Sequence, residues 1–213
     1  MRRAAAVAGV EGDPAELLRD HLVDVAGTLL SERSVSSITT RELARAAGVS
    51  DGVLYNYFGD KNELLLTALV GRFRALVASF HAGVPAPGQH TVRANLVQLA
   101  HGLLELHLAG LPLFGKLAAQ PALLGRFAHE IHRPDAGLSG REIRDAVVGY
   151  VQREQAGGRI GDCDAGAVAD LLIGSVALHA LLAVTAGAPA AERIPALVDT
   201  LVAGLAQPRR RSS

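Results

Sequence analysis

The chain has 213 residues, of which 49% are apolar and 20% charged, and its 21 basic residues are balanced by 21 acidic ones. This composition is typical of a folded soluble protein that forms one large domain, or a small domain on a larger one. A single cysteine, Cys163, excludes an intrachain disulfide and a metal site of paired cysteines, which fits a cytoplasmic location.

Apolar residues recur at spacings of three and four along the chain, and no long segment alternates with the two-residue period of a strand. We therefore expect an all-α fold. The N-terminal segment has no leucine-rich stretch, so we expect no signal peptide there, and residues 1–13 and 207–213 should be flexible tails. The first helix should begin after the cap Asp13, with Pro14 at its first position. One face of it should carry Leu18, Leu22, Val25 and Leu29.

Residues 39–61, with the sequence TTRELARAAGVSDGVLYNYFGDK, predict two short helices joined at a glycine. Thr39 and Glu42 have the spacing of a capping box, in which each side chain accepts a backbone N–H at the helix start. Gly48 should end that helix in the left-handed conformation, and Ser50 should cap the second helix. This pattern is typical of a helix-turn-helix, with the motif at about 39–58, so DNA is the first partner to consider.

The two faces of the second helix differ in character. Its inner face should form a small core with the first helix, made by Leu43, Ala47, Val49, Leu54 and Phe58. Its outer face carries Asp51, Gly52, Val53, Tyr55, Asn56 and Tyr57. In a major groove, Asn can bond an adenine edge, Val can meet a thymine methyl, Asp can accept from cytosine, and Tyr hydroxyls can reach phosphates. Gly52 would let the start of the helix approach the DNA closely.

A further capping box, Asp60 with Glu63, should start the next helix, which runs toward Phe80. Lys61 in its first turn would point a cation toward the DNA backbone. Between residues 31 and 61, four cations face four anions, so no net basic patch is present. Affinity for phosphates must then come from hydroxyls, helix ends and a few placed cations, and two copies in a dimer would help.

Over residues 14 to 70 the chain resembles the DNA-binding domain of the TetR family of bacterial transcriptional regulators. The resemblance is carried by Thr40, Leu43-Ala44, Ala47-Gly48-Val49-Ser50, Gly52, Leu54-Tyr55, Tyr57-Phe58, Lys61 and Leu64. The family usually has His where this chain has Tyr57. The resemblance implies that Thr40, Tyr57 and Lys61 hold phosphates. It implies that the remaining DNA-binding residues read or approach bases, or shape the start of the reading helix: Arg41, Ser50, Asp51, Gly52, Val53, Tyr55 and Asn56.

The remainder of the chain should be helical, after a break at residues 84–88. We expect helices at about 91–109, 111–119, 121–132, 139–156, 171–188 and 194–206. Residues 171–188 carry no formal charge and reach the length of a membrane span. Asp170, a central His179, many alanines and the lack of an aromatic belt favour instead a helix buried against its own core and a partner. We therefore expect a homodimer formed by the last two helices as a four-helix bundle, and no membrane.

The expected organisation is a helix-turn-helix domain at 14–72 and a ligand-binding and dimerisation domain at 73–206. The TetR resemblance implies a small-molecule pocket in the larger domain, whose occupancy changes the spacing of the two reading heads. Histidines on apolar helices could orient a mostly hydrophobic ligand; the alternative for each is a surface-facing or satisfied core residue. The candidate pocket residues are His101, Leu104, His107, Phe114, Phe127, His132 and His179.

The sequence offers little support for metal binding or catalysis. His129 and His132 share a helical face, but their spacing is not that of an HExxH motif and no third ligand is evident. No nucleophile elbow or phosphate-binding glycine loop occurs, so we expect no enzyme, no metal and no cofactor. Two hypotheses remain: a ligand-responsive regulator, usually a repressor, that binds a palindromic operator as a dimer, or an α-helical binding or scaffold protein without a DNA function.

Overall fold

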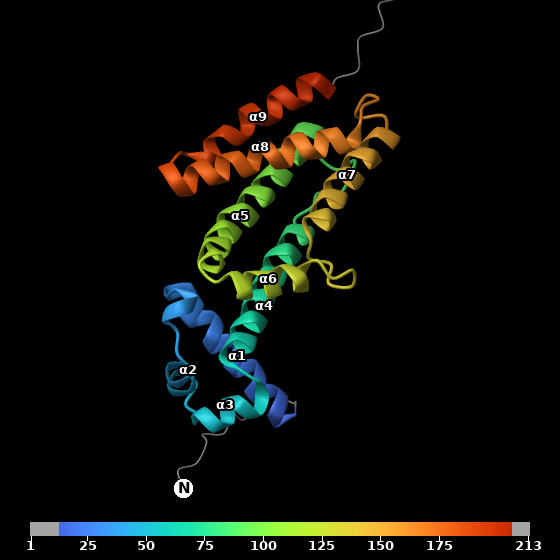
Figure 1. Cartoon of the computed structure of the whole chain (residues 1–213). Helices are drawn as coiled ribbons and strands as arrows, with labels where there is room; N and C mark the ends of the chain where they lie inside the picture. Colours follow the sequence, from blue (N-terminus) through green and yellow to red (C-terminus); the bar gives the residue numbers. More distant parts are fainter. Residues whose placement is uncertain (1–12, 206–213) are drawn as a thin grey trace, which may run out of the picture. The chain divides into compact units, whose positions relative to one another are not determined.

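The computed structural model describes residues 13–205, all of whose regular structure is helical. The predicted tails, 1–13 and 207–213, lie outside this range except for Asp13. The helices are α1 (Pro14–Glu32), the 3-10 turn η1 (Val35–Ser37), α2 (Thr40–Ala46), α3 (Asp51–Tyr57), α4 (Lys61–Ala82), α5 (Val92–Ala118), α6 (Pro121–Ile131), α7 (Gly140–Ala156), α8 (Ala165–Ala186) and α9 (Ala190–Leu205) (Figure 1). The predicted all-α fold is confirmed.

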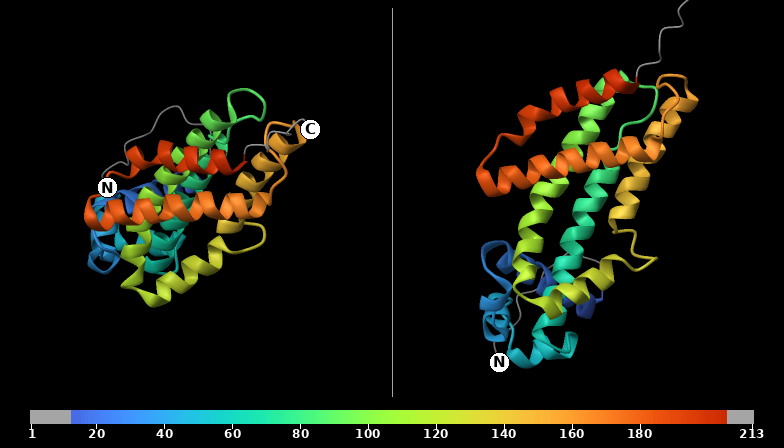
Figure 2. Two further views of the ribbon diagram at one scale, coloured as in Figure 1. Left: turned by 90° about the horizontal axis from the view of Figure 1, so that it is seen from above. Right: turned by 45° about the horizontal axis from the view of Figure 1, so that its top comes forward.

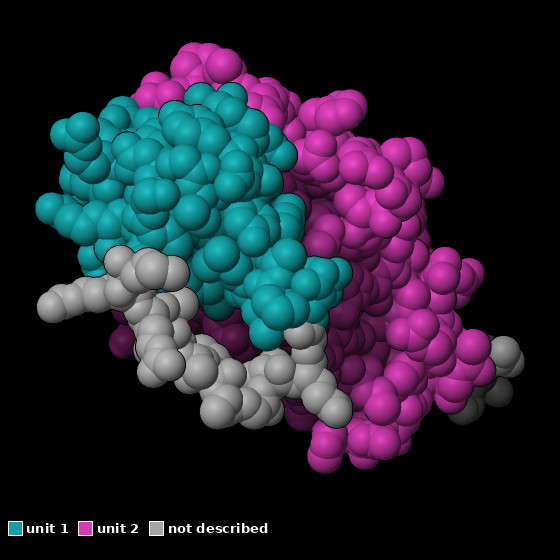
Figure 3. All heavy atoms as spheres, turned by 90° about the horizontal axis from the view of Figure 1, so that it is seen from below, with its two compact units in different colours: residues 1–69 teal, residues 70–213 magenta. Residues whose placement is uncertain are grey.

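The chain forms two compact units, residues 1–69 and residues 70–213 (Figure 3). The boundary between them falls inside α4, so a single helix passes from one unit into the other.

The first unit holds α1, α2, α3 and the start of α4. Asp13 caps α1 as expected, because its carboxylate accepts the N–H of Ala15 at 3.0 Å. The buried line of α1 is Leu22, Ala26 and Leu30, whereas the predicted Leu18, Val25 and Leu29 are only half-buried. Steps of four residues connect the buried positions, so the inner face lies slightly to one side of the predicted stripe.

In the second unit α5 packs against α6, α8 and α9, while α8 also packs against α7 and α9 (Figures 1 and 2). The prediction of two helices at 91–109 and 111–119 was wrong, because α5 continues through Pro112. Leu106, Gly110, Leu113 and Leu117 form an unbroken buried stripe across the proline. Burial of that stripe outweighs the loss of one backbone hydrogen bond.

Both C-terminal helices begin earlier than the sequence predicted. α8 starts at Ala165, because the Asp164 carboxylate accepts the N–H groups of Gly166 and Ala167, at 2.8 and 3.1 Å. It ends at Ala186, where Gly187 adopts a left-handed φ of 67°. α9 starts at Ala190 rather than 194 and carries Pro195 inside it.

A buried polar cluster closes the end of the second unit near the predicted break at 84–88. The Glu154 side chain is 1% exposed and accepts hydrogen bonds from the Tyr150 hydroxyl at 2.9 Å, Asn95 Nδ2 at 3.3 Å and the Gly88 N–H at 3.3 Å. The Arg159 guanidinium pairs with it at 3.2 Å. Burial raises the pKa of Tyr150 well above its ordinary value. The cluster therefore ties the 84–90 segment to α5 and α7.

Candidate DNA-binding surface

The start of α2 is fixed by the predicted capping box and by an ion pair that the sequence did not indicate. Glu42 Oε2 accepts the Thr39 N–H at 2.9 Å, and the Thr39 hydroxyl accepts the Glu42 N–H at 3.3 Å. Arg33 donates to Glu42 Oε1 at 2.8 Å and to the Ser37 carbonyl at 3.0 Å. The Arg33 hydrogen bond, followed by those from Thr39, lowers the pKa of Glu42 to about 2. Arg33 thereby links the end of α1 to the first turn of α2.

The turn between α2 and α3 follows the predicted geometry with one difference. Gly48 has a φ of 70°, and the Val49 N–H donates a hydrogen bond to the Ala44 carbonyl at 2.9 Å. Ser50 occupies the N-cap of α3, but its hydroxyl makes no capping hydrogen bond, so the expected side-chain cap is wrong. The Ser50 carbonyl instead accepts the Val53 N–H at 3.0 Å and closes the first turn.

α3 separates an inner apolar side from an outer polar one. Leu54, Phe58 and Leu43 of α2 are fully buried. All three belong to the predicted core between the two helices. On the outer side Tyr55 is 53% exposed. The other predicted reading residues of α3 are exposed (Asp51, Gly52 and Asn56) or half-buried (Val53 and Tyr57). A short helix thus presents two aromatic hydroxyls, an amide and a carboxylate.

The N-terminus of α4 lies next to this face in the chain and is held by its own side chains. Asp60 Oδ1 accepts the Glu63 N–H at 2.7 Å, as in the predicted capping box. Glu63 Oε2, however, accepts the N–H of Gly59 at 2.8 Å, one residue earlier than predicted. Lys61 Nζ donates to the carbonyl of Ile38, the C-cap residue of η1, at 2.7 Å and ties α4 to the segment between η1 and α2. This bond occupies one of its three N–H donors, while the expected phosphate contact would use another.

Two residues at the start of α2 and one residue of α1 complete the surroundings. Thr40 is half-buried and Arg41 is exposed at the start of α2. Arg19 of α1 places its guanidinium carbon 5.1 Å from the centre of the ring of Phe58, the C-cap residue of α3. Sequence reasoning missed Arg19, because 39 residues separate the two side chains and no local pattern joins them.

Residues 13–69 carry five cations and nine anions, a formal charge of −4. One of the cations, Arg33, is already paired with Glu42. A single copy of this unit therefore offers little of the nonspecific attraction that a basic surface gives to DNA. Specific binding has to come from the placed groups of α2, α3 and the start of α4.

Comparison with known proteins identifies this unit. Residues 22–68 match the family described as bacterial regulatory proteins, tetR family. The chain carries the DNA-binding domain of the TetR family. Among its relatives, the transcriptional repressor KstR2 of Rhodococcus jostii is 38% identical over 68 residues, which are 29% of this chain and 33% of that protein. The transcriptional regulator BetI of Cronobacter sakazakii is 27% identical over 143 residues, 64% of this chain and 66% of that protein.

These alignments span between a third and two thirds of the length of the two TetR-type relatives. Both relatives are described as regulators of transcription. Solved structures extend the likeness to the whole fold. A protein of unknown function from Rhodococcus is 28% identical with a TM-score of 0.65, covering 95% of this chain and all of that one.

A putative TetR-family regulator from Mesorhizobium loti is 18% identical with a TM-score of 0.67, covering 91% of this chain and 98% of that one. FadR from Bacillus subtilis, solved in complex with stearoyl-CoA, is 14% identical with a TM-score of 0.56, covering 88% of this chain and 99% of that one. Both show the same fold.

The TetR-like fold also accounts for the apolar helices. Lys61–Ala82, Val92–Ala118 and Ala165–Ala186 are long and apolar enough to cross a membrane by length and composition alone. The fold shared with the Mesorhizobium structure covers 91% of the chain. They therefore do not indicate a membrane protein.

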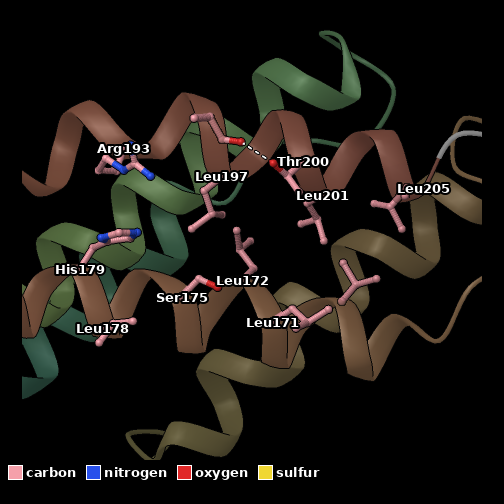
Figure 4. A pocket seen from close by; sticks show the side chains of 13 residues that line it. Leu171, Leu172, Ser175, Leu178, His179, Arg193, Leu197, Thr200, Leu201 and Leu205 are labelled. Carbon is pink, nitrogen blue, oxygen red and sulfur yellow. Dashed lines mark hydrogen bonds between the residues drawn. The ribbon is translucent and has the colours of Figure 1, made fainter.

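The seven candidate pocket residues fall in different places in the second unit. His107, Phe114 and His132 line one cavity of about 350 Å³. His101 lines a second cavity, of about 570 Å³, beside Phe80. His179 lines a third, of about 620 Å³, between α8 and α9 (Figure 4).

The two remaining candidates lie in the core rather than among the lining residues of these cavities. Leu104 is buried, and the buried Phe127 ring supports the first cavity from behind, 5.7 Å from the Phe114 ring and 5.8 Å from that of Phe73. His129 is exposed. Among residues 13–205 no group of three or more His, Cys, Asp or Glu is placed to hold a metal ion.

Proposed function

We propose that this TetR-like protein is a cytoplasmic repressor that binds a palindromic operator as a homodimer and is released by a small apolar ligand. The observation that carries the proposal is the outer face of α3. Tyr55, Asn56 and Asp51 are exposed on a helix whose start and inner side are fixed by the turn and the core. These are side chains that can read base edges in a major groove.

The dimer is supported by an apolar face on α8 that the chain itself leaves uncovered. Leu171, Leu178 and Leu182 are 61%, 54% and 40% exposed and share one side of the helix, at spacings of seven and four. The adjoining groove between α8 and α9 continues this face through Leu197 and Leu201 (Figure 4). A second copy in two-fold symmetry would cover both helices and form the predicted four-helix bundle.

Dimerisation would also supply the DNA affinity that one unit lacks. Residues 13–69, with a formal charge of −4, gain little from counterion release, so a single head should bind weakly. Two linked heads make the second contact intramolecular and raise the overall affinity without any new contact. A symmetric dimer would read an inverted repeat.

Ligand response is supported by the cavity of about 350 Å³ that contains His107, Phe114 and His132, because that volume lies within the range of small-molecule sites. FadR from Bacillus subtilis holds stearoyl-CoA in the same fold. Lys61, an expected phosphate contact, is the first residue of α4, and Phe73 of the same helix lines the cavity. The proposed DNA contact and the proposed ligand site therefore belong to one helix. A ligand that binds one arrangement of α4 better would shift the population of operator-competent dimers.

A gel-shift experiment with DNA from just upstream of the gene tests the proposal. The wild-type protein should bind a fragment that contains an inverted repeat, and Tyr55→Ala should weaken this binding. Arg141→Ala, exposed on α7, serves as a matched surface control and should bind as the wild type does. If the wild-type dimer binds none of the inverted repeats at low salt, the result would contradict the proposal and favour an α-helical binding or scaffold protein without a DNA function.

A further inference from the structure

The cavity of about 350 Å³ in the second unit is nearly free of polar side chains. Its walls come from α4, α5, α6, α7 and α8, and its lining is aromatic, aliphatic or glycine apart from two histidines, His107 and His132. No Lys, Arg, Asp or Glu lines it. A ligand with a full charge would therefore find no permanent opposite charge on these walls.

Hydrogen bonding fixes the tautomer of both histidines. His107 Nδ1 lies 2.7 Å from the Leu103 carbonyl oxygen, and His132 Nδ1 lies 2.8 Å from the Ala128 carbonyl oxygen. A carbonyl oxygen can only accept, so Nδ1 carries the hydrogen in both rings. In a neutral imidazole the other nitrogen, Nε2, is then a hydrogen-bond acceptor. The only lining side chains with polar atoms thus offer acceptors and no donor.

We propose, on the basis of the ligand-responsive function above, that this cavity binds an uncharged apolar molecule that carries a hydroxyl group, with the hydroxyl donating to Nε2 of His107 or His132. A ligand hydroxyl can donate a hydrogen bond to the Nε2 atom of either ring. A ligand whose polar group can only accept, such as an ester or a ketone, gains nothing from two acceptors. A carboxylate would meet like-signed lone pairs without a cation to offset them.

The aromatic part of the lining favours a ring in the ligand body. The Phe73 and Phe114 rings meet edge to face, with centres 6.0 Å apart, and Phe127 packs against both from behind. Edge-to-face packing can extend to a further aromatic ring. A phenol therefore combines the two features that the walls select, a flat apolar body and one hydroxyl donor.

The test compares three probes of nearly equal size: 2-naphthol, naphthalene and 2-naphthoate. Binding to the full chain is measured at pH 8, where an ordinary imidazole is neutral, by titration of the naphthalene fluorescence. One hydrogen bond should make 2-naphthol bind about three- to tenfold tighter than naphthalene. The naphthoate should bind more weakly than the naphthol. Equal binding of naphthol and naphthalene, tightest binding of the naphthoate, or binding of none of the three would overturn the proposal.

Histidine variants assign the preference to this cavity. The double variant His107→Phe/His132→Phe should lose the preference for the naphthol while still binding naphthalene. His107→Gln/His132→Gln keeps side-chain acceptors of similar reach and should retain much of the preference, which a folding defect would not allow. His101→Phe, in the neighbouring cavity, is the matched control and should behave as the wild type. A preference that survives the double Phe variant, or is lost in His101→Phe, would contradict the assignment.

No DNA is present in these titrations, so their outcome is separable from that of the proposed function. Failure of operator binding in the gel shift leaves the naphthol preference as measured. Loss of the preference with normal operator binding rejects the ligand class and leaves the regulator.

Discussion

The exposed leucines of α8 give the sharpest prediction about assembly. Leu178 is 54% exposed in the single chain and lies at the centre of the apolar face that a second copy would cover. Burying a whole leucine side chain contributes about 1.5–3 kcal/mol, so covering half of it contributes about 1 kcal/mol, and two symmetric copies contribute about 2 kcal/mol. In Leu178→Asp this contribution is lost, and two carboxylates must be buried or solvated within the interface at a further cost of several kcal/mol.

A combined loss of about 4 kcal/mol weakens dimerisation by about a thousandfold. Sedimentation velocity over a dilution series should therefore show dimers for the wild type and monomers for Leu178→Asp, with unchanged helicity by circular dichroism. Leu108→Asp, a substitution of a partly exposed leucine on α5, is the matched control and should remain dimeric. A Leu178→Asp variant that sediments as a dimer at every concentration would refute the assignment of the interface to α8.

Four other outcomes follow from the DNA-binding unit and the buried cluster. Asn56→Ala should relax selection at one base pair of each half-site, costing about 1–3 kcal/mol there, as measured by competition with mutated operators. Lys61→Ala should reduce the slope of log K against log salt by about 0.9 per copy; an unchanged slope would mean that its amine contacts no phosphate. The folded pKa of Glu42 is lowered, so its contribution to stability is present above the ordinary value of 4.5 and is lost as pH falls toward about 2. The melting temperatures of wild type and Glu42→Gln should accordingly converge over that range and differ above it. Tyr150→Phe removes a partner of the buried Glu154 and should lower the free energy of unfolding in urea by about 1–3 kcal/mol; a change below about 0.5 kcal/mol would show that the cluster does not need it.

Local chemistry explains what could be predicted from the sequence. Asp13, Thr39 with Glu42, and Gly48 act through backbone groups within four residues, so their caps and turn are visible in the sequence and occur as expected. The same holds for the inner and outer faces of α3, because helical periodicity separates Leu54 from Tyr55.

What the sequence could not show depends on contacts between distant segments. Pro112 normally argues for a helix end, but burial on both sides of it keeps α5 continuous. Three contacts join residues that lie 9 to 66 positions apart in the sequence: Arg33 with Glu42, Lys61 with the Ile38 carbonyl, and Glu154 with the Gly88 N–H. No local sequence pattern predicts them. The seven pocket candidates do not share one cavity for the same reason. The sequence shows that histidines lie on apolar helices, but it does not show which helices face a common cavity.

Selection of binding sites from a pool of random duplex DNA tests whether the protein is a dimeric operator-binding regulator. Full-length protein is mixed with the pool at low salt, and bound fragments are recovered, amplified and sequenced. We predict an inverted repeat whose half-sites lie about one helical turn apart, as expected for two copies of α3 in successive major grooves. Enrichment of no sequence, or of an asymmetric single site, would contradict the account of a dimeric operator-binding regulator.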